Sequence, residues 1–573
     1  MRRRFRRLSS VRIALAPLMI AHLSSAAATA TAQTDTLQTV QRATALIRSQ
    51  QYDAAIVVLE AITEREPENA QAWMFLGYAL HASGDIDRAI PAHLRAAEFE
   101  ATAPAASYNA GLTYARKGDI DNAFEWLFRA RDSGKVDVTK IAFDPNAATL
   151  EDDERYAQLF PSPEDFADPF LEDVEILQQW LGDEMGAEFG WIARDIGDVD
   201  GDGVNDVTTS APSSSRNGEN SGMIFVFSGK TGDLLWSLAG QPGDRLGLGI
   251  EAAGDVNADQ IPDVIAGAPG AGKTYVYSGA DGVLLVTLHE RQEDERFGRR
   301  VSDLGDVNND LHADVVVGAP QSDAAGDDAG RIYIFSGRDG GLLLTLDGDR
   351  AGDRFGSAVA GYYDGTRMLL AVGAPNAGPG NGGRVYVYHD LSGRPAFTIE
   401  ADETGAALGG MFVSIVGDVN ADGTPDVYAS DWSNSAHGRS TGRVYVHSGT
   451  DGRLLHTFTG EAAGDGFGIG PADAGDVNGD GHDDLIIGAW QQSGAAAAGG
   501  KVYLYSGRDG SLIGAYTGKV PGETLGFDAT GLGDVNGDGT LDFLVSSAWS
   551  SVNGPRSGRV YILSGKIEEN GEP

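Results

Sequence analysis

Residues 475–485 read GDVNGDGHDDL, and variants of this phrase return at a nearly fixed pitch through the last two thirds of the chain. Oxygen-bearing side chains stand at the first, third, fifth and ninth positions of each nine-residue copy, and the sixth position is Gly in four of the six. Hard cations such as Ca²⁺ take about six to eight oxygen ligands, which alternate residues of a tight loop can supply. The phrase therefore predicts a cation loop in each copy. The copies are Asp198 onward (DVDGDGVND), Asp255 (DVNADQIPD), Asp306 (DVNNDLHAD), Asp418 (DVNADGTPD), Asp476 (DVNGDGHDD) and Asp534 (DVNGDGTLD).

The surroundings of the loops indicate that they connect strands. A helix-loop-helix calcium site opens in the same way but ends in Glu at its twelfth position. Here the twelfth residue of the first copy is Thr209, and apolar runs such as LIIGA and VVVGA follow the loops. The alternative is that Asp-Gly and Asn-Gly only mark hairpin turns. Six copies in phase, with oxygen at four fixed positions, favour the cation interpretation.

Each loop belongs to a longer unit of about 56 residues. A unit has an FG or LG pair, an apolar run, the loop, a strand ending in GAP or GAW, a strand like GRVYVHSG, a tight turn and a strand like RLLHTFTG. Four short strands per unit, repeated seven times, predict an all-β seven-bladed propeller. The opening pairs are Phe189-Gly190, Leu246-Gly247, Phe297-Gly298, Phe355-Gly356, Leu408-Gly409, Phe467-Gly468 and Leu525-Gly526.

The two ends of the repeat region predict how the ring closes. The seventh unit stops at VYILSGK without a final strand, whereas VEILQQWLG, residues 174–182, stands alone before the first FG pair. We expect residues 174–182 to complete the last blade.

The unit resembles the FG-GAP repeat of integrin α-subunit heads and of bacterial exported proteins, because the FG pair, the DxNxDGxxD loop and the GAP triplet recur in order over residues 174–565. The resemblance implies Ca²⁺ in up to six loops, with the seventh loop residue contributing its backbone carbonyl. It implies no ion in the fourth unit, which has YYDGTRMLLAVGAP instead, and weaker sites where Gln260 and Leu311 replace the turn Gly, by about 1 kcal/mol. The strongest sites are therefore expected in blades one, five, six and seven. The expected ligands are Asp198, Asp200, Asp202, Val204 and Asp206; Asp255, Asn257, Asp259, Ile261 and Asp263; Asp306, Asn308, Asp310, His312 and Asp314; Asp418, Asn420, Asp422, Thr424 and Asp426; Asp476, Asn478, Asp480, His482 and Asp484; and Asp534, Asn536, Asp538, Thr540 and Asp542.

The resemblance also implies that partners are met on the face opposite the cation loops. Trp432, Trp490 and Trp549 replace the GAP proline in blades five to seven, and Trp191 follows the first FG pair. Amphipathic aromatic side chains gathered on one face are typical of a binding patch for a protein or glycan ligand. The alternative is that these side chains fill gaps between blades. Integrin α heads have aromatic residues beside the FG pairs, where this chain has Arg245, Arg296 and Arg354, so we expect no integrin-type heterodimer.

The front of the chain, from about residue 35 to residue 138, is Ala-rich with a 34-residue repeat. Ala55, Ala89 and Ala123 keep that spacing, and small residues at fixed points let paired helices approach closely. The segment resembles tetratricopeptide repeats: Trp73, Leu76, Gly77 and Ala89 match the motif in the second copy, Pro67 ends the first, and Leu80 and His93 depart from it. The resemblance implies a groove for a peptide or protein partner; a spacer or an oligomerisation module is the alternative.

These patterns divide the chain into five parts. The segment KIAFDPNAATLEDDERYAQLF reads as an amphipathic helical cap on the last repeat, and PSPEDFADPF is Pro-rich and acidic, as linkers often are. We expect a signal peptide (1–32), an all-α domain of three tetratricopeptide-like repeats plus the cap (33–160), a linker (161–173), the propeller (174–565) and a tail (566–573).

Composition favours an exported protein. The opening MRRRFRRLSSVR, the apolar IALAPLMIAHL and the small residues ending near Ala32 form a secretory signal peptide pattern, and the apolar part is too short for an ordinary transmembrane helix. The chain has no Cys for disulfides or lipid attachment. Its formal charge of −40 disfavours nucleic acid and anionic membrane surfaces as partners. We therefore expect a periplasmic, cell-surface or extracellular location.

The function favoured by these features is an exported, calcium-binding interaction scaffold for protein binding or adhesion at the cell envelope. It is not expected to be an enzyme, because the chain has no HExxH motif and its ten His residues do not pair at ligand spacing. Two alternatives stay open. One is a propeller enzyme, either a hydrolase or a quinoprotein-like dehydrogenase. The stretch KTGDLLWSL, which contains Trp236, faintly resembles the Trp-docking repeat of such dehydrogenases. The other is a purely structural envelope component.

Overall fold

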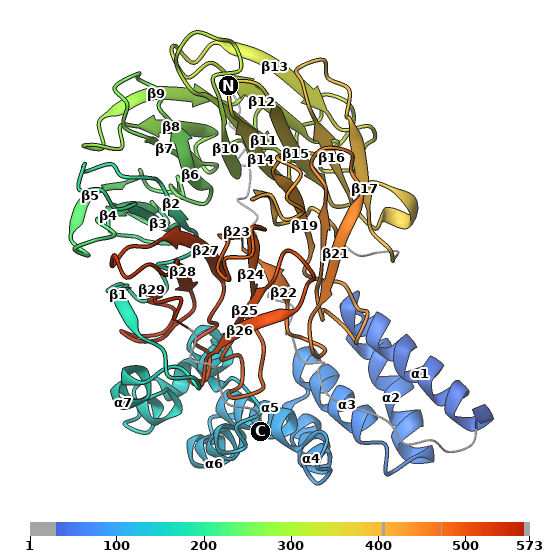
Figure 1. Cartoon of the computed structure of the whole chain (residues 1–573). Helices are drawn as coiled ribbons and strands as arrows, with labels where there is room; N and C mark the ends of the chain where they lie inside the picture. Colours follow the sequence, from blue (N-terminus) through green and yellow to red (C-terminus); the bar gives the residue numbers. More distant parts are fainter. Residues whose placement is uncertain (1–29, 404–406, 471–472, 567–573) are drawn as a thin grey trace, which may run out of the picture.

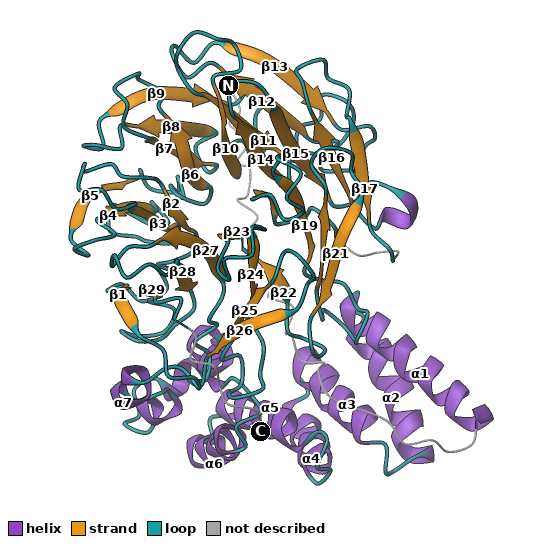
Figure 2. Cartoon of the chain, viewed as in Figure 1, coloured by secondary structure: helices purple, strands orange, loops and turns teal. Residues whose placement is uncertain are grey.

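The computed structural model describes residues 30–403, 407–470 and 473–566, and the side chains within this range from residue 39 onward. Figure 1 shows the strands arranged as a ring of blades, with helices α1 to α7 gathered beside it, and Figure 2 shows the same division between helix and strand. Nearly all of the predicted signal peptide and tail lies outside the described residues. Within those residues, no helix is both long and apolar enough to cross a bilayer.

The N-terminal part consists of helical hairpins, as predicted. Asn69, Asp85 and Asp119 cap the N-termini of helices by accepting hydrogen bonds from backbone N–H groups in the first turn. Gly84 and Gly118 end helices with φ values of 94° and 83°, a backbone that favours Gly. The helices are α1 (Ala30–Arg48), α2 (Tyr52–Arg65), α3 (Ala70–Ser83), α4 (Ile86–Ala97), α5 (Ala103–Lys117), α6 (Ile120–Asp132) and α7 (Pro163–Ala167).

His93, which departs from the repeat motif, is a packing residue. It is fully buried, and a Cβ atom added at Gly77 would lie 2.5 Å from its ring. Neither ring nitrogen has a hydrogen-bond partner among the described residues, and burial lowers its pKa to about 3. The imidazole is therefore neutral and fills the space that Gly77 leaves between two helices.

The predicted helical cap forms, but as three short 3₁₀ turns instead of one amphipathic α-helix. Asp137 and Asp144 each accept a hydrogen bond from a backbone N–H two residues later, and Pro145 has no N–H to continue a helix. Val138, Ile141 and Leu150 nevertheless bury their side chains against α5 and α6. The turns are η1 (Val138–Phe143), η2 (Pro145–Leu150) and η3 (Tyr156–Leu159).

The segment predicted as a linker is attached to the propeller along most of its length. Phe166 and Phe170 are buried, and the ring of Phe170 lies 5.4 Å from that of Tyr561 in blade seven. Backbone hydrogen bonds join residues 169 and 171 to the outer strand region of blade six, at 2.9 and 2.8 Å. Residues 161–173 thus fix the helical part against blades six and seven.

Seven sheets of antiparallel strands form the predicted seven blades. A fourth short turn, η4 (Pro379–Asn381), lies in a loop of blade four. Blade one contains β2 (Ala193–Asp195), β3 (Val207–Ala211), β4 (Met223–Phe227) and β5 (Leu234–Ala239); blade two β6 (Ile250–Gly254), β7 (Asp263–Ala268), β8 (Lys273–Tyr277) and β9 (Leu284–His289); blade three β10 (Arg300–Gly305), β11 (Asp314–Ala319), β12 (Arg331–Phe335) and β13 (Leu342–Asp347); blade four β14 (Ala358–Tyr363), β15 (Met368–Ala374), β16 (Arg384–Tyr388) and β17 (Phe397–Glu400); blade five β18 (Val413–Val416), β19 (Asp426–Asp431), β20 (Arg443–His447) and β21 (Leu454–Thr459); blade six β22 (Phe467–Ile469), β23 (Asp473–Gly475), β24 (Asp484–Ala489), β25 (Lys501–Tyr505) and β26 (Leu512–Thr517); and blade seven β27 (Asp528–Gly533), β28 (Asp542–Ser547), β29 (Arg559–Leu563) and β1 (Ile176–Leu181).

The ring closes as the sequence predicts. Strand β1 pairs antiparallel with β29, so the first strand of the propeller is the outer strand of its last blade. Trp180 in β1 stacks on Phe227 of blade one at 4.9 Å between ring centroids, and its indole N–H donates to the Gly232 carbonyl at 2.8 Å. The closing strand therefore joins blade seven to blade one as well.

The FG pairs fasten each blade to its neighbour. Phe297 and Phe355 are fully buried in the cores between blades. A Cβ atom at Gly267 would lie 1.8 Å from the Gly298 carbonyl oxygen, so the FG turn of blade three touches the backbone of blade two. Because side chains cannot fit at these contacts, glycine is required there.

Candidate functional site

The six carboxylate loops share one backbone geometry. Each connects the inner strand of its blade to the second strand, and the first Asp accepts hydrogen bonds from backbone N–H groups at the fifth and sixth positions. In blade one, Asp198 accepts from Asp202 N at 3.1 Å and from Gly203 N at 2.9 Å. The fourth and sixth residues have positive φ in all six loops. The loops are thus wound so that their alternate side chains turn inward.

The ninth Asp organises each loop from within. Asp206 is fully buried; one carboxylate oxygen accepts from Val199 N at 2.8 Å, and the other accepts from Gly229 N, beyond the third strand, at 3.0 Å. All six ninth residues are buried and accept from that distant Gly in the same way. This side chain therefore fixes the loop to its blade and also offers oxygen lone pairs to the interior of the loop.

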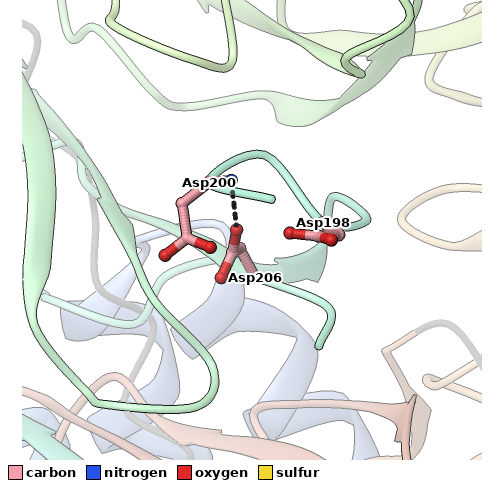
Figure 3. A group of neighbouring side chains, drawn as sticks. All are labelled: Asp198, Asp200 and Asp206. Carbon is pink, nitrogen blue, oxygen red and sulfur yellow. Dashed lines mark hydrogen bonds between the residues drawn. The ribbon is translucent and has the colours of Figure 1, made fainter. Parts of the chain in front are cut away.

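Negative charge converges inside the blade-one loop. Figure 3 shows Asp198, Asp200 and Asp206, whose ligating atoms lie within 4.8 Å of one another. Among the described residues this is the one group of three His, Cys, Asp or Glu side chains so placed. In the other five loops the third position is Asn, and the three Asp side chains at the first, fifth and ninth positions do not all come within that distance of one another. Burial, and then repulsion from Asp200, raises the pKa of Asp206 to about 6. Asp426 in blade five has its pKa raised to about 7, mainly by burial.

These residues fit a hard divalent cation. In blade three the buried Asn308 amide oxygen has no hydrogen-bond partner among the described residues, although the amide nitrogen donates to Asp314 at 3.1 Å. A cation inside the loop would satisfy such an oxygen and would offset the repulsion between carboxylates. The side chains that could hold it are those at the first, third, fifth and ninth positions.

The two loops without the turn Gly adopt the strained backbone that the sequence predicts for them. Gln260 and Leu311 both have φ of 72°, close to the 83–87° of Gly at this position in the other four loops. Leu311 is 82% exposed, so its side chain gains little packing in return. Left-handed backbone at a residue with a side chain costs about 1 kcal/mol or more.

Blade four, which has no carboxylate loop, has a basic side chain at that place. Its strands β14 and β15 are joined by a short turn in which Asp364 accepts hydrogen bonds from the N–H groups of Thr366 and Arg367. The Arg367 guanidinium donates to the carbonyl of Gly423 and to Thr424 Oγ1 at 2.8 Å, both in the loop of blade five. A guanidinium thus joins two neighbouring blades here.

Lysine side chains approach the loops of blades one and seven, a feature that the sequence analysis missed. Lys566 Nζ lies 2.7 Å from Asp538 Oδ2, at the fifth position of the blade-seven loop. Lys230 Nζ donates to the Asp202 carbonyl at 2.7 Å in blade one. The sequence does contain a pattern that could have indicated these contacts, because both lysines follow an SG dipeptide at the same point of their repeats. The Lys566 contact is the main cause that lowers the pKa of Asp538.

The loops also contact one another around the ring. The ring of His312, seventh in the blade-three loop, hydrogen-bonds to the Val256 carbonyl in the blade-two loop at 2.7 Å. His482 makes the same contact to Val419, from blade six to blade five, at 2.9 Å. These hydrogen bonds join the loops of neighbouring blades to one another.

The four predicted tryptophans gather on the opposite face, where the loops after the second and fourth strands lie. Trp191, Trp432 and Trp549 are half-buried and pack with Phe527 and the buried Trp490 in one cluster. Ring centroids of Trp490 and Trp549 are 4.7 Å apart. We call these four residues the tryptophan cluster.

Two members of the tryptophan cluster are held by internal contacts. Trp490 is only 7% exposed. The indole N–H of Trp549 donates to Glu188 at 3.2 Å, and the Arg556 guanidinium covers its ring at 4.1 Å and that of Phe143 at 4.5 Å. The side chains of Trp191 and Trp432 are half-buried and make no hydrogen bond to the described residues, so they are the members without a polar contact that holds them in place.

Two hollows accompany these faces. A cavity of about 490 Å³ at the centre of the ring is lined by the inner strands, including Arg194, which is paired with Glu251 and Asp528. A second cavity of about 730 Å³ lies between the helical repeats and blades five and six, with Tyr108 and Lys140 on one side and Glu461 on the other. The helical part thus faces the propeller across a cleft.

Comparison with protein families agrees with this architecture. The tetratricopeptide repeat family matches residues 40–104, the FG-GAP repeat matches residues 300–335, and the FG-GAP-like repeat matches residues 418–487 and 476–545. The chain therefore carries FG-GAP repeats in its propeller and tetratricopeptide repeats at its N-terminal end.

Several animal proteins are similar to parts of the chain. Integrin alpha-4 of Xenopus laevis is 30% identical over 179 residues, which cover 29% of this chain and 17% of the integrin. Integrin alpha-2 of Bos taurus is 30% identical over 166 residues, covering 26% and 14%. Phosphatidylinositol-glycan-specific phospholipase D of Homo sapiens is 28% identical over 405 residues, covering 58% and 47%. The chain thus spans less than half the length of each of these relatives.

Proposed function

We propose that this chain, a seven-bladed propeller of FG-GAP repeats fixed to tetratricopeptide repeats, is an exported, calcium-stabilised scaffold that binds a protein or glycan ligand at the cell envelope. The observation that carries the proposal is that the two faces of the propeller carry different groups of side chains. Six carboxylate loops of one geometry lie on one face, and an aromatic cluster lies on the other. Integrin-like propellers and tetratricopeptide repeats both favour an interaction role.

Calcium is the proposed cation because the loops offer oxygen atoms from carboxylates, amides and backbone in flexible, tightly wound segments. Up to six ions are proposed, in blades one, two, three, five, six and seven. Strained backbone at Gln260 and Leu311 and the nearby Lys230 and Lys566 each oppose binding in one blade. The guanidinium of Arg367 lies beside the blade-five loop in the same way, so the tightest site is proposed in blade six.

Export is supported by the charge and apolar pattern of residues 1–32, and the absence of Cys suits an envelope protein stabilised by ions instead of disulfides. The cleft between the helices and blades five and six gives the helical repeats a surface for a second protein partner. Such a surface would let the chain hold two partners at once.

Affinity capture from the exported and envelope fractions of the producing cell tests the scaffold proposal. The full chain is used as bait in millimolar Ca²⁺ and again with chelator. We expect a partner that is retained only with Ca²⁺ and is lost from a Trp432→Ala, Trp191→Ala variant. Leu234→Ala, at an exposed residue on the outer strand of blade one, is the matched control and should retain the partner. A partner held equally by all forms would contradict the role of the propeller face.

A Leu311→Gly substitution should strengthen the blade-three site. The exposed Leu sits in left-handed backbone that Gly adopts freely, so relief of strain should add about 1 kcal/mol to Ca²⁺ binding there. Calorimetric titration of both proteins measures the change. The reverse substitution, Gly481→Ala in blade six, should weaken binding by a similar amount; equal affinities in all three proteins would show that this backbone does not limit the sites.

A Lys566→Met substitution should raise the Ca²⁺ affinity of blade seven by about two- to fivefold, because the ion must otherwise displace an exposed ion pair from Asp538. Arg508→Met is the matched control: Arg508 holds the same place in blade six, and its side chain makes no hydrogen bond or ion pair to the described loop residues. Binding isotherms resolve the two variants. Weaker binding by Lys566→Met would mean that the lysine supports the loop.

A propeller hydrolase is the second candidate, because the similarity to the human phospholipase extends over more of this chain than the integrin similarities do. Incubation of the full chain with a phosphatidylinositol-glycan substrate, followed by analysis of released head group, tests it. The scaffold proposal predicts no turnover above buffer in the presence of Ca²⁺.

A further inference from the structure

Five arginines form a cluster on the face opposite the cation loops. They are Arg245, Arg296, Arg299, Arg300 and Arg354, and they come from blades two, three and four. Because the strands of each blade are antiparallel, the turns before the inner strands lie at the other end of the sheet from the carboxylate loops. We call these residues the arginine cluster.

Three members of the arginine cluster occupy the same position in successive blades. Arg245, Arg296 and Arg354 each precede an LG or FG pair, with φ of 55°, 59° and 57°. Gly466 stands at this position in blade six with φ of 60°, a backbone that glycine adopts without strain. The FG turns of blades three and four are pressed against the backbone of the preceding blade at Gly267 and Gly318. The fold therefore holds the three arginines in fixed places, at a cost in backbone strain.

The arginine cluster is poorly neutralised by the protein itself. The Nε atom of Arg245 is buried without a hydrogen-bond partner, and the described residues provide no hydrogen bond or ion pair for the Arg299 side chain. Arg300 donates to the carbonyls of Met411 and Arg299, which are uncharged. Arg354 meets Asp328 at 3.3 Å and Arg296 meets Gln321 at 2.9 Å, so Asp328 is the one carboxylate among the described residues in direct contact with the cluster. Asp528 and Glu251 lie near Arg300, but both are paired with Arg194.

Like charges repel within the arginine cluster. The pKa of Arg299 is lowered by the partial loss of water around its guanidinium and then by Arg296, Arg245 and Arg354, although the residue keeps an exposed surface. Burial, Arg299 and Arg194 lower the pKa of Arg300 to about 9, while the carboxylates of Asp528 and Glu251 act in the opposite direction. Such repulsion is unusual in a chain whose formal charge is −40, where carboxylates to offset it are plentiful. An anionic group placed between the guanidinium groups would remove the repulsion and fill their hydrogen-bonding capacity.

The arginine cluster adjoins the tryptophan cluster. The Arg300 guanidinium lies over the ring of Phe412 at 5.7 Å, and Phe412 packs in the same hydrophobic group as Trp191 and Trp432. Arginine and aromatic side chains side by side are typical of the centre of protein interfaces. The long-range field of a strongly acidic chain opposes extended polyanions, so a ligand with a few local carboxylates fits better than a charged polymer.

We propose that the arginine cluster binds acidic side chains of a protein partner, whose neighbouring apolar residues rest on the tryptophan cluster. This inference rests on the proposed scaffold function and adds the chemistry of the partner. The carboxylates would be held by paired guanidinium hydrogen bonds from adjacent blades. Each such contact would contribute specificity for Asp or Glu at defined spacing.

Fluorescence anisotropy with a labelled 15-residue peptide tests the proposal. The peptide carries Glu and Asp interleaved with Trp, Leu and Gly, and the full chain is titrated in millimolar Ca²⁺. Arg296→Gln, Arg299→Gln and Arg354→Gln together should weaken binding by about tenfold or more, since charge-assisted contacts are lost at three positions. A peptide with Lys in place of the acidic residues should not bind.

The matched control removes the same charge from the opposite face. Arg338→Gln, Arg394→Gln and Arg453→Gln change exposed residues in the turns between third and fourth strands. This control should bind the peptide within about twofold of the parent, because long-range charge alone is weakly felt at physiological salt. Equal loss in both triple variants would overturn the proposal, as would binding of an anionic oligosaccharide that depends on the arginine cluster when the acidic peptide does not bind.

A stability readout separates binding from folding. The arginine-cluster variant should melt at the same temperature as the parent or higher, because it loses repulsion and little packing. A melting temperature lowered by several degrees would show that these arginines serve the fold and would overturn the proposal. If the peptide binds as expected but affinity capture finds no Ca²⁺-dependent partner, the scaffold function fails and the site stands. If a captured partner is retained by the arginine-cluster variant, the site fails and the scaffold stands.

Discussion

Replacing Trp180 with Ala is expected to lower the free energy of unfolding of the propeller by about 3–5 kcal/mol, the usual cost of removing a large buried aromatic side chain. Trp180 is 8% exposed, stacks on Phe227 of blade one and donates a hydrogen bond to Gly232. It stands on the closing strand β1, so its loss weakens both the last blade and its contact with the first. Denaturant unfolding, monitored by the far-ultraviolet circular dichroism of the backbone instead of by tryptophan fluorescence, measures the change.

Leu181→Ala is the control for this prediction. Leu181 is the next residue of the same strand, and its side chain is 41% exposed. Its replacement should cost less than about 1 kcal/mol, because little apolar surface is lost. If the two variants were destabilised equally, the strand itself and not the buried seam to blade one would determine closure.

Removing Ca²⁺ is expected to have the other large effect. At a free concentration 100 times the dissociation constant, one ion adds about 2.7 kcal/mol to the stability of the folded state. Several loops in contact around one ring should together raise the melting temperature by about 10 °C or more. Differential scanning calorimetry in Ca²⁺ and in chelator measures this difference.

Substitutions in two blades give the control. Asp484→Asn replaces a buried ninth-position carboxylate in blade six, where it accepts hydrogen bonds from Val477, Asn478 and Gly507. It should reduce the stabilisation by Ca²⁺. Asp364→Asn in blade four, which has no carboxylate loop, should leave that stabilisation unchanged. If Ca²⁺ raised the melting temperature of both variants by the same amount, the blade-six loop would not be a site of the stabilising ion.

The propeller could be predicted from the sequence because each repeat contains all the elements of one blade. The FG pair, the loop and four strands recur in fixed order, and the unpaired segment at 174–182 leaves one place for the closing strand β1. The cap was harder to predict. Its amphipathic pattern suits an α-helix, but Asp137, Asp144 and Pro145 favour short turns through local hydrogen bonds. The linker composition likewise concealed Phe166 and Phe170, whose burial depends on contacts with distant blades.

In the candidate site, too, features set within one loop could be predicted from the sequence, whereas contacts between separate parts of the chain could not. The positive φ at Leu311 follows from its position in the loop and could be expected from sequence. The reach of Lys566 to Asp538 and of Arg367 to blade five could not, because each depends on how separate hairpins face one another. The burial of Trp490 could not be predicted either. Its place after a strand predicts on which face of the propeller it lies, but its exposure depends on the neighbouring side chains.

The number of Ca²⁺ ions bound per chain decides whether the carboxylate loops are calcium sites. Equilibrium dialysis of the full chain against buffered Ca²⁺, followed by elemental analysis, gives that number. We predict saturation at six ions, with the site of blade six filling first, and a loss of one ion in Asp484→Asn. No bound calcium at millimolar concentration, or a number unchanged by Asp484→Asn, would contradict the assignment of the carboxylate loops as the calcium sites of this scaffold.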